Sequence, residues 1–358
     1  GRLEQALAEA RELVRRHPEF AGGHHNLAAI CNKLDRLDEA EAEAERAAEL
    51  APQVQRHHRS LAEILKRQGK LDKALGAALT ALSLEDNAKA RFRLGLILRE
   101  RGELDEAVKN FRRSLELDPE DNEGASIFLA ALGGGGSPEA APQGYIRRVF
   151  DSYAVRFDEH LVKGLRYEAP WRFMEALAPH LSGARGLRVL DLGCGTGLCG
   201  RLLRPLAVNL EGVDLSERMI EQAGRSGVYD RLEVGDAIQA LRQRRDLDLV
   251  AAGDLLIYLG DLGPIFSALA GALGKGGLFV GNVEALGEEG WSINPAGRYA
   301  HSEAYVRRVV QEAGLSVLSL APACLREEDK QPVPGYLMVL QAPECPAAYS
   351  LDKFPAGD

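Results

Sequence analysis

Several features that mark other classes of protein are missing from this sequence of 358 residues. Its five cysteines are odd in number and form no C-x-x-C pair, so neither disulfides nor a zinc site are expected. No apolar run approaches the roughly 18 residues of a membrane span, and no signal-peptide pattern opens the chain. The net charge of −9 disfavours general affinity for nucleic acid or an anionic membrane. These absences predict a cytoplasmic globular protein without a metal, a nucleic-acid partner or a membrane partner.

The most informative stretch is residues 187–200, which read LRVLDLGCGTGLCG. It begins as an apolar strand, passes through three alternating glycines, and continues with leucines at helical spacing. Alternating glycines allow a tight turn and the close approach of a ligand to bare backbone. Asp214 ends the next apolar run about 20 residues later, where a carboxylate accepts hydrogen bonds from ribose hydroxyls. The pattern predicts a strand, a glycine turn and a helix that together bind a nucleotide-like cofactor.

Two classes of cofactor are compatible with this stretch. Residues 195–200 match the G-x-G-x-x-G pattern of nicotinamide and flavin enzymes. Residues 191–197, DLGCGTG, instead resemble motif I of the class I S-adenosylmethionine-dependent methyltransferases. In that family the carboxylate at the strand end faces the ammonium side of the cofactor, and no pyrophosphate is present for Asp191 to repel. The resemblance implies S-adenosyl-L-methionine as the cofactor and S-adenosyl-L-homocysteine as the product.

The first 132 residues repeat with a period of 33 or 34 residues. A leucine followed three positions later by an alanine opens each repeat, at Leu3, Leu37, Leu71 and Leu104. This is the period of tetratricopeptide repeats, helix–turn–helix units that stack into a solenoid. Residues 1–132 are therefore predicted to form an all-α domain whose groove takes a protein or peptide partner. A spacer or a dimerisation element is the alternative.

A change of composition follows the repeats. Residues 133–144 are rich in glycine and proline and are predicted to form a linker. Residues 145–161 then place Phe150, Tyr153 and Phe157 on one face of a helix. The segment resembles the N-terminal lid of many small-molecule methyltransferases, which implies that Tyr153 reaches the methionine end of the cofactor. A helix that only packs on the sheet is equally compatible with the pattern.

Strands and helices alternate through the rest of the chain. Apolar runs predict strands at 187–192, 210–214, 231–234, 246–252, 277–283, 315–320 and 336–340. The last two are joined by a polar loop with Pro332 and Pro334, too short for a crossover helix, so they should be antiparallel. The expected fold of residues 145–342 is α/β, doubly wound and Rossmann-like, with the seven-stranded sheet that the methyltransferase resemblance implies. Residues 343–358 are expected to be an extended tail.

Ligands of a doubly wound sheet lie at the carboxyl ends of its strands, where this chain has four aspartates. The resemblance assigns the ribose to Asp214, the adenine amino group to Asp236 and the ammonium group to the carbonyl of Gly253. The full set of implied cofactor-binding residues is Tyr153, Asp191, Gly193, Gly195, Gly197, Asp214, Leu215, Met219, Asp236, Ala237 and Gly253.

The acceptor side is less defined by the sequence. Methyl transfer is an in-line displacement, so the protein must align a nucleophile and take up its proton. Catalytic candidates near the expected mouth of the site are Asp254, Tyr258, Glu284 and His301. No N-P-P-Y or D-P-P-Y sequence follows the fourth strand, which disfavours an amide or base nitrogen as acceptor.

With its repeats included, the chain resembles a group of bacterial predicted methyltransferases that carry tetratricopeptide repeats. This resemblance implies an enzyme that methylates an oxygen, nitrogen or acidic group of a small molecule, or of a peptide or protein presented by the repeats. Two alternatives remain. One is a non-catalytic scaffold whose methyltransferase fold senses the cofactor, and the other is a nicotinamide-dependent enzyme.

Overall fold

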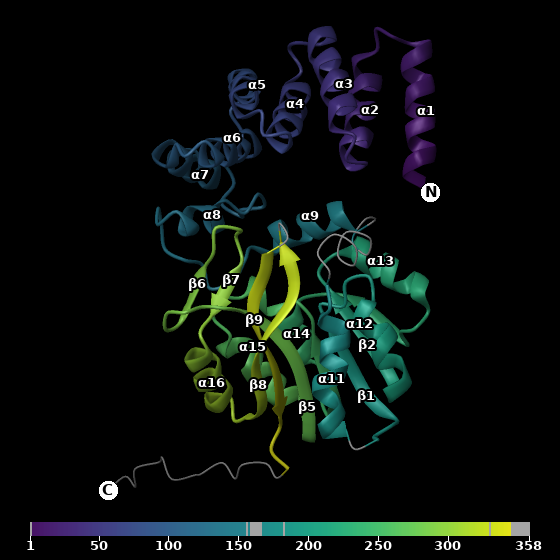
Figure 1. Cartoon of the computed structure of the whole chain (residues 1–358), viewed down its shortest axis with the longest axis vertical. Coiled ribbons are helices and arrows are strands. Elements are labelled where there is room, and N and C mark those ends of the chain that lie inside the picture. Colours follow the sequence, from purple (N-terminus) through teal and green to yellow (C-terminus); the bar gives the residue numbers. More distant parts are fainter. Residues whose placement is uncertain (1, 155–156, 158–166, 182, 329–330, 345–358) are drawn as a thin grey trace, which may run out of the picture. The chain divides into compact units, whose positions relative to one another are not determined.

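The computed structural model describes residues 2–154, 157, 167–181, 183–328 and 331–344. The chain divides into two compact units, Gly1–Gly136 and Ser137–Asp358. The first contains only helices, and the second is a mixed α/β unit (Figure 1). Among the helices described, none is long and apolar enough to cross a membrane. Most of the predicted tail, from residue 345 onward, lies outside the described residues, as do positions 155–156 and 158–161 of the predicted lid.

The helical unit follows the period of the sequence. Its helices are α1 (Arg2–Arg16), α2 (Ala21–Lys33), α3 (Leu37–Leu50), α4 (Gln55–Arg67), α5 (Leu71–Leu84), α6 (Ala88–Glu100), α7 (Leu104–Leu117) and α8 (Ala125–Ala131). The pairs α2–α3, α4–α5 and α6–α7 make the most extensive contacts. Small residues allow this close approach: Ala40 and Ala47 are fully buried, and a Cβ on Gly95 would lie 2.7 Å from the Phe111 ring. The predicted all-α solenoid is confirmed.

The α/β unit alternates helices with the strands of a single sheet. Its helices are α9 (Gln143–Tyr153), α11 (Ala169–Leu181), α12 (Leu198–Leu203), α13 (Glu217–Ser226), α14 (Ala237–Arg242), α15 (Gly263–Ala272) and α16 (Glu303–Glu312). Its strands are β1 (Leu187–Leu192), β2 (Ala207–Asp214), β3 (Arg231–Val234), β4 (Leu247–Ala252), β5 (Leu273–Ala285), β6 (Trp291–Ile293), β7 (Tyr299–His301), β8 (Ser316–Glu328) and β9 (Gln331–Gln341).

The sheet has the parallel core expected of a doubly wound fold. Strands run in the order β3-β2-β1-β4-β5 and are parallel, while β9 pairs antiparallel with β5 and β8 pairs antiparallel with β9. The predicted Rossmann-like fold is therefore confirmed. The predicted number of strands is wrong, because the described residues form nine strands rather than seven.

The two additional strands, β6 and β7, have three residues each, too few for a side-chain pattern to reveal them. β7 pairs in parallel with Glu284 and Ala285 at the end of β5. Glu284 also pairs with Gly335 of β9, so β7 lies on the other edge of β5. On that edge the pairing of β4 with β5 ends at Ala252, and β7 pairs with the part of β5 that extends beyond this point.

The last hairpin is longer than the sequence suggested. The predicted polar loop with Pro332 and Pro334 is wrong, because both prolines lie within β9 and pair with Glu327 and Cys324 of β8. The pairing of β9 with β5 begins only at Gly335. The prolines therefore occupy a part of β9 that borders one strand, where a missing N–H is tolerated.

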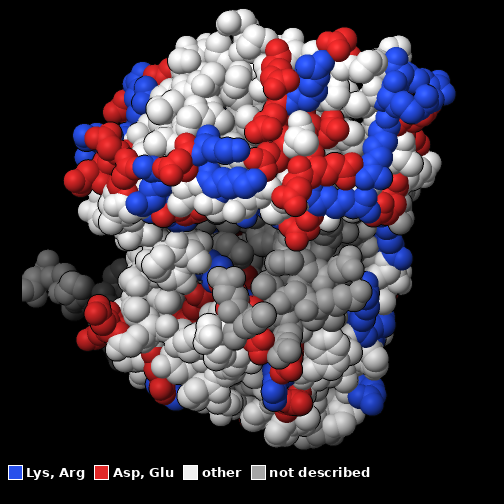
Figure 2. Space-filling view, turned by 45° about the horizontal axis from the view of Figure 1, so that its top comes forward, with Lys and Arg blue, Asp and Glu red and all other residues white. Residues whose placement is uncertain are grey.

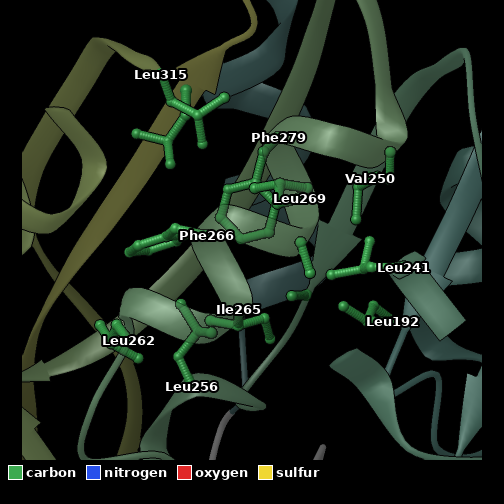
Figure 3. Packing of buried hydrophobic residues seen from close by; sticks show 14 of the residues in the cluster. Leu192, Leu241, Val250, Leu256, Leu262, Ile265, Phe266, Leu269, Phe279 and Leu315 are labelled. Carbon is green, nitrogen blue, oxygen red and sulfur yellow. The ribbon is translucent and has the colours of Figure 1, made fainter. Parts of the chain in front are cut away.

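Both faces of the sheet are covered by apolar packing. Leu190 and Val250 point into one cluster, which also contains Phe266 of α15 and Phe279 of β5 (Figure 3). Their neighbours in the strands, such as Leu249, point into a second cluster with α11 on the opposite face. This explains why the parallel strands read as continuous apolar runs.

The segment predicted as a linker makes specific contacts in its second half. The Tyr299 hydroxyl donates to the Pro138 carbonyl at 2.8 Å, and the Ala141 N–H donates to the Tyr258 carbonyl at 2.9 Å. Gly260 N–H also donates to the Glu139 carbonyl. Residues 138–142 are therefore held on the α/β unit, directly before α9.

Candidate active site

A cavity of about 470 Å³ lies at the carboxyl ends of the parallel strands. Its lining includes Gly193 and Gly253, which follow β1 and β4, the two strands between which the strand order reverses. Open α/β sheets bind ligands at such a switch point. The volume falls within the range of roughly 300–1,000 Å³ found for small-molecule sites.

Three glycines shape the turn after β1, as the sequence predicted. Gly193, Gly195 and Gly197 have φ values of +70°, +53° and +93°, a region that side chains disfavour. Gly193 and Gly195 line the cavity. Gly197 is the residue before α12, and the Tyr229 ring lies 3.0 Å from where its Cβ would be. The structure thus places Gly197 beside the cavity wall rather than in it.

Asp214 lies at the end of β2 and lines the cavity. Its Oδ2 accepts the Gly195 N–H at 3.0 Å and its Oδ1 accepts the Ser216 N–H at 2.8 Å. Burial raises the pKa of this carboxyl, and the two backbone donors oppose that shift. The donors fix the carboxylate's orientation and leave lone pairs on both oxygens for a ligand.

The region after β2 and β3 provides further predicted contacts. Leu215, Asp236 and Ala237 line the cavity. Asp236 caps α14 by accepting the Gln239 N–H, and its second oxygen accepts from the Gln143 side chain at 3.0 Å. Met219, by contrast, is fully buried and is not among the described residues of the cavity wall.

Asp191 lies behind the glycine turn rather than in the cavity wall. It is 1% exposed, and the Tyr229 hydroxyl donates to its Oδ2 at 2.6 Å. Burial raises the pKa of Asp191 to about 7, and the hydrogen bond from Tyr229 opposes the shift. Because Tyr229 also packs against Gly197 and Gly200, Asp191 supports the turn from behind. That Asp191 faces the ammonium side of the cofactor therefore stays a prediction.

Asp254 lines the cavity next to Gly253, just after the end of β4. Its φ of +51° is unusual for a residue other than glycine. Asn282 holds it in place twice, accepting its N–H at 3.0 Å and donating to its Oδ1 at 2.6 Å. Arg326 donates to its Oδ2 at 2.8 Å.

Arg326 lies at the centre of a network that we call the arginine cluster, made of Asp254, Glu284, Arg298, Arg326 and Glu328. Arg326 is 5% exposed and donates to all three carboxylates. Burial alone would lower its pKa, but the neighbouring carboxylates raise it overall. Arg298 donates hydrogen bonds to the carboxylates of Glu284 and Glu328, at 2.5 and 2.6 Å. Both arginines line the cavity, so the cluster forms its polar wall.

Two predicted catalytic residues are not brought to the cavity wall. Glu284 is buried and accepts from Asn294, Arg298 and Arg326. His301 is fully buried in β7, bonded through Nε2 to the Gly260 carbonyl at 3.1 Å. Burial lowers the His301 pKa to about 4, so the ring is neutral at pH 7. Glu284 was predicted because it ends the fifth strand, and His301 because its segment lies near the expected mouth of the site. In the structure the arginine cluster encloses Glu284, and His301 lies buried in β7.

An aromatic wall faces these polar groups. Phe150, Tyr153, Phe157 and Tyr258 all line the cavity. The rings of Phe150 and Tyr258 pack edge to face with their centroids 5.6 Å apart, and those of Tyr153 and Phe157 do so with centroids 5.4 Å apart. Burial raises the Tyr258 pKa. Tyr153 and Tyr258 are thus the two predicted tyrosines that the structure does bring to the cavity.

The sequence did not single out Tyr229, Arg298, Arg326 or Glu328. Their roles depend on contacts with residues far away in the chain, such as the pair Arg326–Asp254, 72 positions apart. No local signal marked Arg326, because it opens the polar run Arg326-Glu327-Glu328 between the last two predicted strands. No group of three or more metal-binding side chains occurs in the part of the chain that the structure describes.

Comparison with known proteins identifies both parts of the chain. Residues 189–277 match the family described as methyltransferase domain, and residues 1–54 and 59–122 match tetratricopeptide repeats. The chain is 39% identical over 87 residues to human methyltransferase-like protein 27, covering 24% of this chain and 35% of that protein. It is 33% identical over 104 residues to a ubiquinone biosynthesis O-methyltransferase of Xylella fastidiosa, covering 27% and 42%.

A third relative, the trans-aconitate 2-methyltransferase of Pseudomonas aeruginosa, is 34% identical over 107 residues, covering 29% of this chain and 38% of that protein. The chain thus spans only 35–42% of the length of these three relatives. A solved magnesium protoporphyrin IX methyltransferase from Synechocystis is 17% identical with a TM-score of 0.45, covering 56% of this chain and 99% of that one. The two family matches show that the chain carries tetratricopeptide repeats and a methyltransferase domain.

Proposed function

We propose that the α/β unit binds S-adenosyl-L-methionine in this cavity and transfers its methyl group to an acceptor. The observation that carries the proposal is the meeting of Gly193, Gly195 and Asp214 at the switch point of a methyltransferase-family sheet. The two glycines leave backbone open to a ligand, and Asp214 presents a carboxylate already oriented by two N–H donors. Such a carboxylate suits a pair of ribose hydroxyls.

The other lining residues supply the remaining contacts of this proposal. Asp236, with Ala237 and Leu215 beside it, is assigned to the adenine, and Gly193 and Gly195 to the methionine portion. Tyr153 is assigned to the carboxylate end. Gln143 already donates to the Asp236 side chain, so α9 is tied to the same end of the cavity as the adenine contacts. The cofactor supplies an electrophilic methyl group on a sulfonium, which is a good leaving group.

For the acceptor, we propose an oxygen, nitrogen or acidic group of a small molecule, or of a peptide or protein presented by the repeats. The names of the relatives, among them an O-methyltransferase and a trans-aconitate methyltransferase, favour an oxygen. Asp254 is the carboxylate placed to take the acceptor's proton, because it lines the cavity while Glu284 does not. The aromatic wall with Tyr258 would exclude water and orient the acceptor.

The identity of the cofactor can be tested directly. Mass spectrometry of the ligand released by heating the purified protein should find S-adenosylmethionine or S-adenosylhomocysteine. A nicotinamide or flavin dinucleotide would overturn the proposal. Transfer of a labelled methyl group in an acceptor screen then separates an enzyme from a non-catalytic cofactor sensor.

The ribose assignment is tested by calorimetric titration with S-adenosylhomocysteine. Asp214→Ala should weaken binding by roughly 10–150-fold, the loss of about 1.5–3 kcal/mol expected for hydrogen bonds to a charged group. Asp214→Asn keeps one acceptor oxygen for the turn and should also bind more weakly. Glu221→Ala, on an exposed face of α13, is the matched control. Unchanged affinity in both Asp214 variants would refute the assignment.

A further inference from the structure

The arginine cluster contains one more carboxylate than it has guanidinium groups. Its acidic members are Asp254, Glu284 and Glu328, and its basic members are Arg298 and Arg326. All of them except Glu284 line the cavity. Among the residues that the structure describes, the polar wall of the cavity therefore belongs to a network with an excess of negative charge.

Both arginines of this wall are committed to its carboxylates. Arg326 donates to Asp254 at 2.8 Å and to Glu328 at 3.0 Å. It also donates to Glu284, as does Arg298. Burial by itself would lower the pKa of each guanidinium, yet the neighbouring carboxylates raise both pKa values overall. The positive charge of the wall is thus more than neutralised by the wall itself, and an anionic ligand would have to compete with three carboxylates for it.

One further cation occurs in the described part of the cavity lining. Arg242 is exposed and ends α14, the helix that Asp236 caps. Asp236 is the residue assigned to the adenine, so Arg242 belongs to the helix on the cofactor side of the cavity rather than to the polar wall. An exposed cation also holds an anion weakly, because water and salt compete for it.

A hydroxyl acceptor uses this wall, whereas a carboxylate acceptor does not. When a hydroxyl is methylated, its oxygen forms a bond to the methyl carbon, and the carbon–sulfur bond breaks with its electron pair passing to sulfur. The hydroxyl proton then passes to Asp254, which Asn282 and Arg326 hold at the cavity through both carboxylate oxygens. A carboxylate acceptor has no proton to give, so a second carboxylate beside it would contribute only repulsion.

We propose that the acceptor is an uncharged aromatic molecule with a hydroxyl group, and that the arginine cluster excludes carboxylate acceptors. The rings of the aromatic wall, Phe150, Tyr153, Phe157 and Tyr258, suit a flat aromatic body. The excess negative charge opposite them accepts a hydrogen bond from a hydroxyl and repels an anion, so the same wall favours one class and rejects the other. The acceptor class named here rests on the proposed function, because the wall matters only if methyl transfer takes place in this cavity.

The outer surface offers an anion no compensating attraction. The whole chain carries a net charge of −9. On the face in view in Figure 2, basic and acidic side chains of the described residues are interspersed over the upper part of the picture. Long-range steering of an anion needs a surface of positive potential. The choice between uncharged and anionic acceptors is therefore left to the cavity wall.

Binding of naphthol and of naphthoate to the full chain loaded with S-adenosylhomocysteine tests the proposal. The two probes share one ring system, substituted at the same position, and at pH 7 only naphthoate is charged. Naphthol should bind at least about tenfold more tightly, because the buried anion loses its hydration without gaining an unpaired cation. Calorimetry first measures the binding of S-adenosylhomocysteine, so a failure of the cofactor site is seen separately from a failure of acceptor selection.

A single substitution tests whether the arginine cluster causes this preference. Glu328→Gln removes the excess charge at nearly constant side-chain size, and naphthoate should then bind at least about fivefold more tightly than to the unaltered protein. Glu233→Gln is the matched control, because Glu233 also pairs with an arginine, has a side-chain exposure of 26% against 31% for Glu328, and is not part of the described cavity lining. It should change the affinity for naphthoate less than about twofold. Binding of S-adenosylhomocysteine shows that each variant is folded.

Each other outcome counts against the proposal. Equal affinities for the two probes, tighter binding of naphthoate, or a Kd above about 1 mM for naphthol overturns it, even if Glu328→Gln fails to fold. An equal gain in naphthoate binding by both variants would show that only the net charge of the chain matters. No gain by the folded Glu328→Gln variant would remove the arginine cluster as the cause. If the unaltered protein does not bind S-adenosylhomocysteine, the proposed function is refuted and the acceptor class with it.

Discussion

The two units contain Arg–Glu ion pairs that differ in burial. In the helical unit, ion pairs such as Arg15–Glu12 lie at the surface, with side-chain exposures of 72% and 41%. In the α/β unit, Arg326 and Glu284 pair at exposures of 6% and 7%. An exposed pair contributes about 0–1 kcal/mol, whereas removing one partner of a buried pair costs several times more. Substitution of such exposed charged residues in the helical unit should therefore cost little stability, whereas substitution within the arginine cluster of the α/β unit should cost much more.

The largest effect should come from breaking the arginine cluster. Arg326→Met removes the shared partner of the buried Glu284 and the partly buried Asp254, which should cost about 3–5 kcal/mol of unfolding free energy. Chemical denaturation followed separately in the two units should show this loss in the α/β unit alone. Arg188→Met breaks the half-exposed pair with Asp248 and serves as control, with a cost below about 1 kcal/mol. Similar losses in both variants would remove the distinction between buried and exposed pairs.

Acid should distinguish the units less sharply, because each buries a neutral histidine. The pKa of His301 and that of His57 fall from 6.5 to about 4. Between pH 6.5 and pH 4 each of these histidines is protonated in the unfolded chain but not in the folded chain. The free energy of unfolding therefore falls as the pH drops from 6.5 to 4. The loss approaches about 3 kcal/mol per histidine. His301→Gln should flatten this slope for the α/β unit only, and a slope unchanged in that unit would contradict the assignment.

A smaller effect is expected from the packing of the repeats. A Cβ on Gly95 would lie 2.7 Å from the Phe111 ring, so Gly95→Ala should destabilise the helical unit by about 1–3 kcal/mol. Phe111→Leu in the same chain should recover part of the loss. Thermal unfolding monitored at 222 nm measures both variants. Gly76→Ala is the control, since nothing lies within 4 Å of its Cβ position and it should be neutral or stabilising. A loss as large at Gly76 as at Gly95 would show that packing against Phe111 is not the cause.

The smallest effect concerns the aromatic wall. If Tyr153 reaches the carboxylate of the cofactor, Tyr153→Phe should weaken S-adenosylhomocysteine binding by about 0.5–1.5 kcal/mol. The ring and its edge-on contact with Phe157 remain in this variant, so the aromatic wall keeps its packing. Tyr145→Phe, on the same helix, provides a control for the loss of a hydroxyl. Normal binding by Tyr153→Phe would leave α9 with a packing role only.

Sequence reasoning reached different depths in the two units. The repeats were predictable because each 33- or 34-residue unit buries the same alanines against its partner helix, as Ala40 and Ala74 show. The glycine turn and Asp214 were predictable because backbone geometry and strand ends impose local rules. Arg326 was not, since its partners come together only when β8 joins the sheet. Glu284 was placed correctly at the end of a strand, but nothing local shows that Arg298 and Arg326 enclose it. His301 lies in a strand of three residues, too short for the sequence to reveal.

The position of β9 has a consequence for the order of events during synthesis. β9 is the last strand among the described residues, yet it lies between β5 and β8 and pairs with both. While the ribosome is still producing residues 335–341, the edge of β5 remains open and β8 has no strand to join. Arg326 is therefore held beside Asp254 only after residues 335–341 have been made. The repeats have all left the ribosome by then, so they can engage a partner before the cavity of the α/β unit is complete.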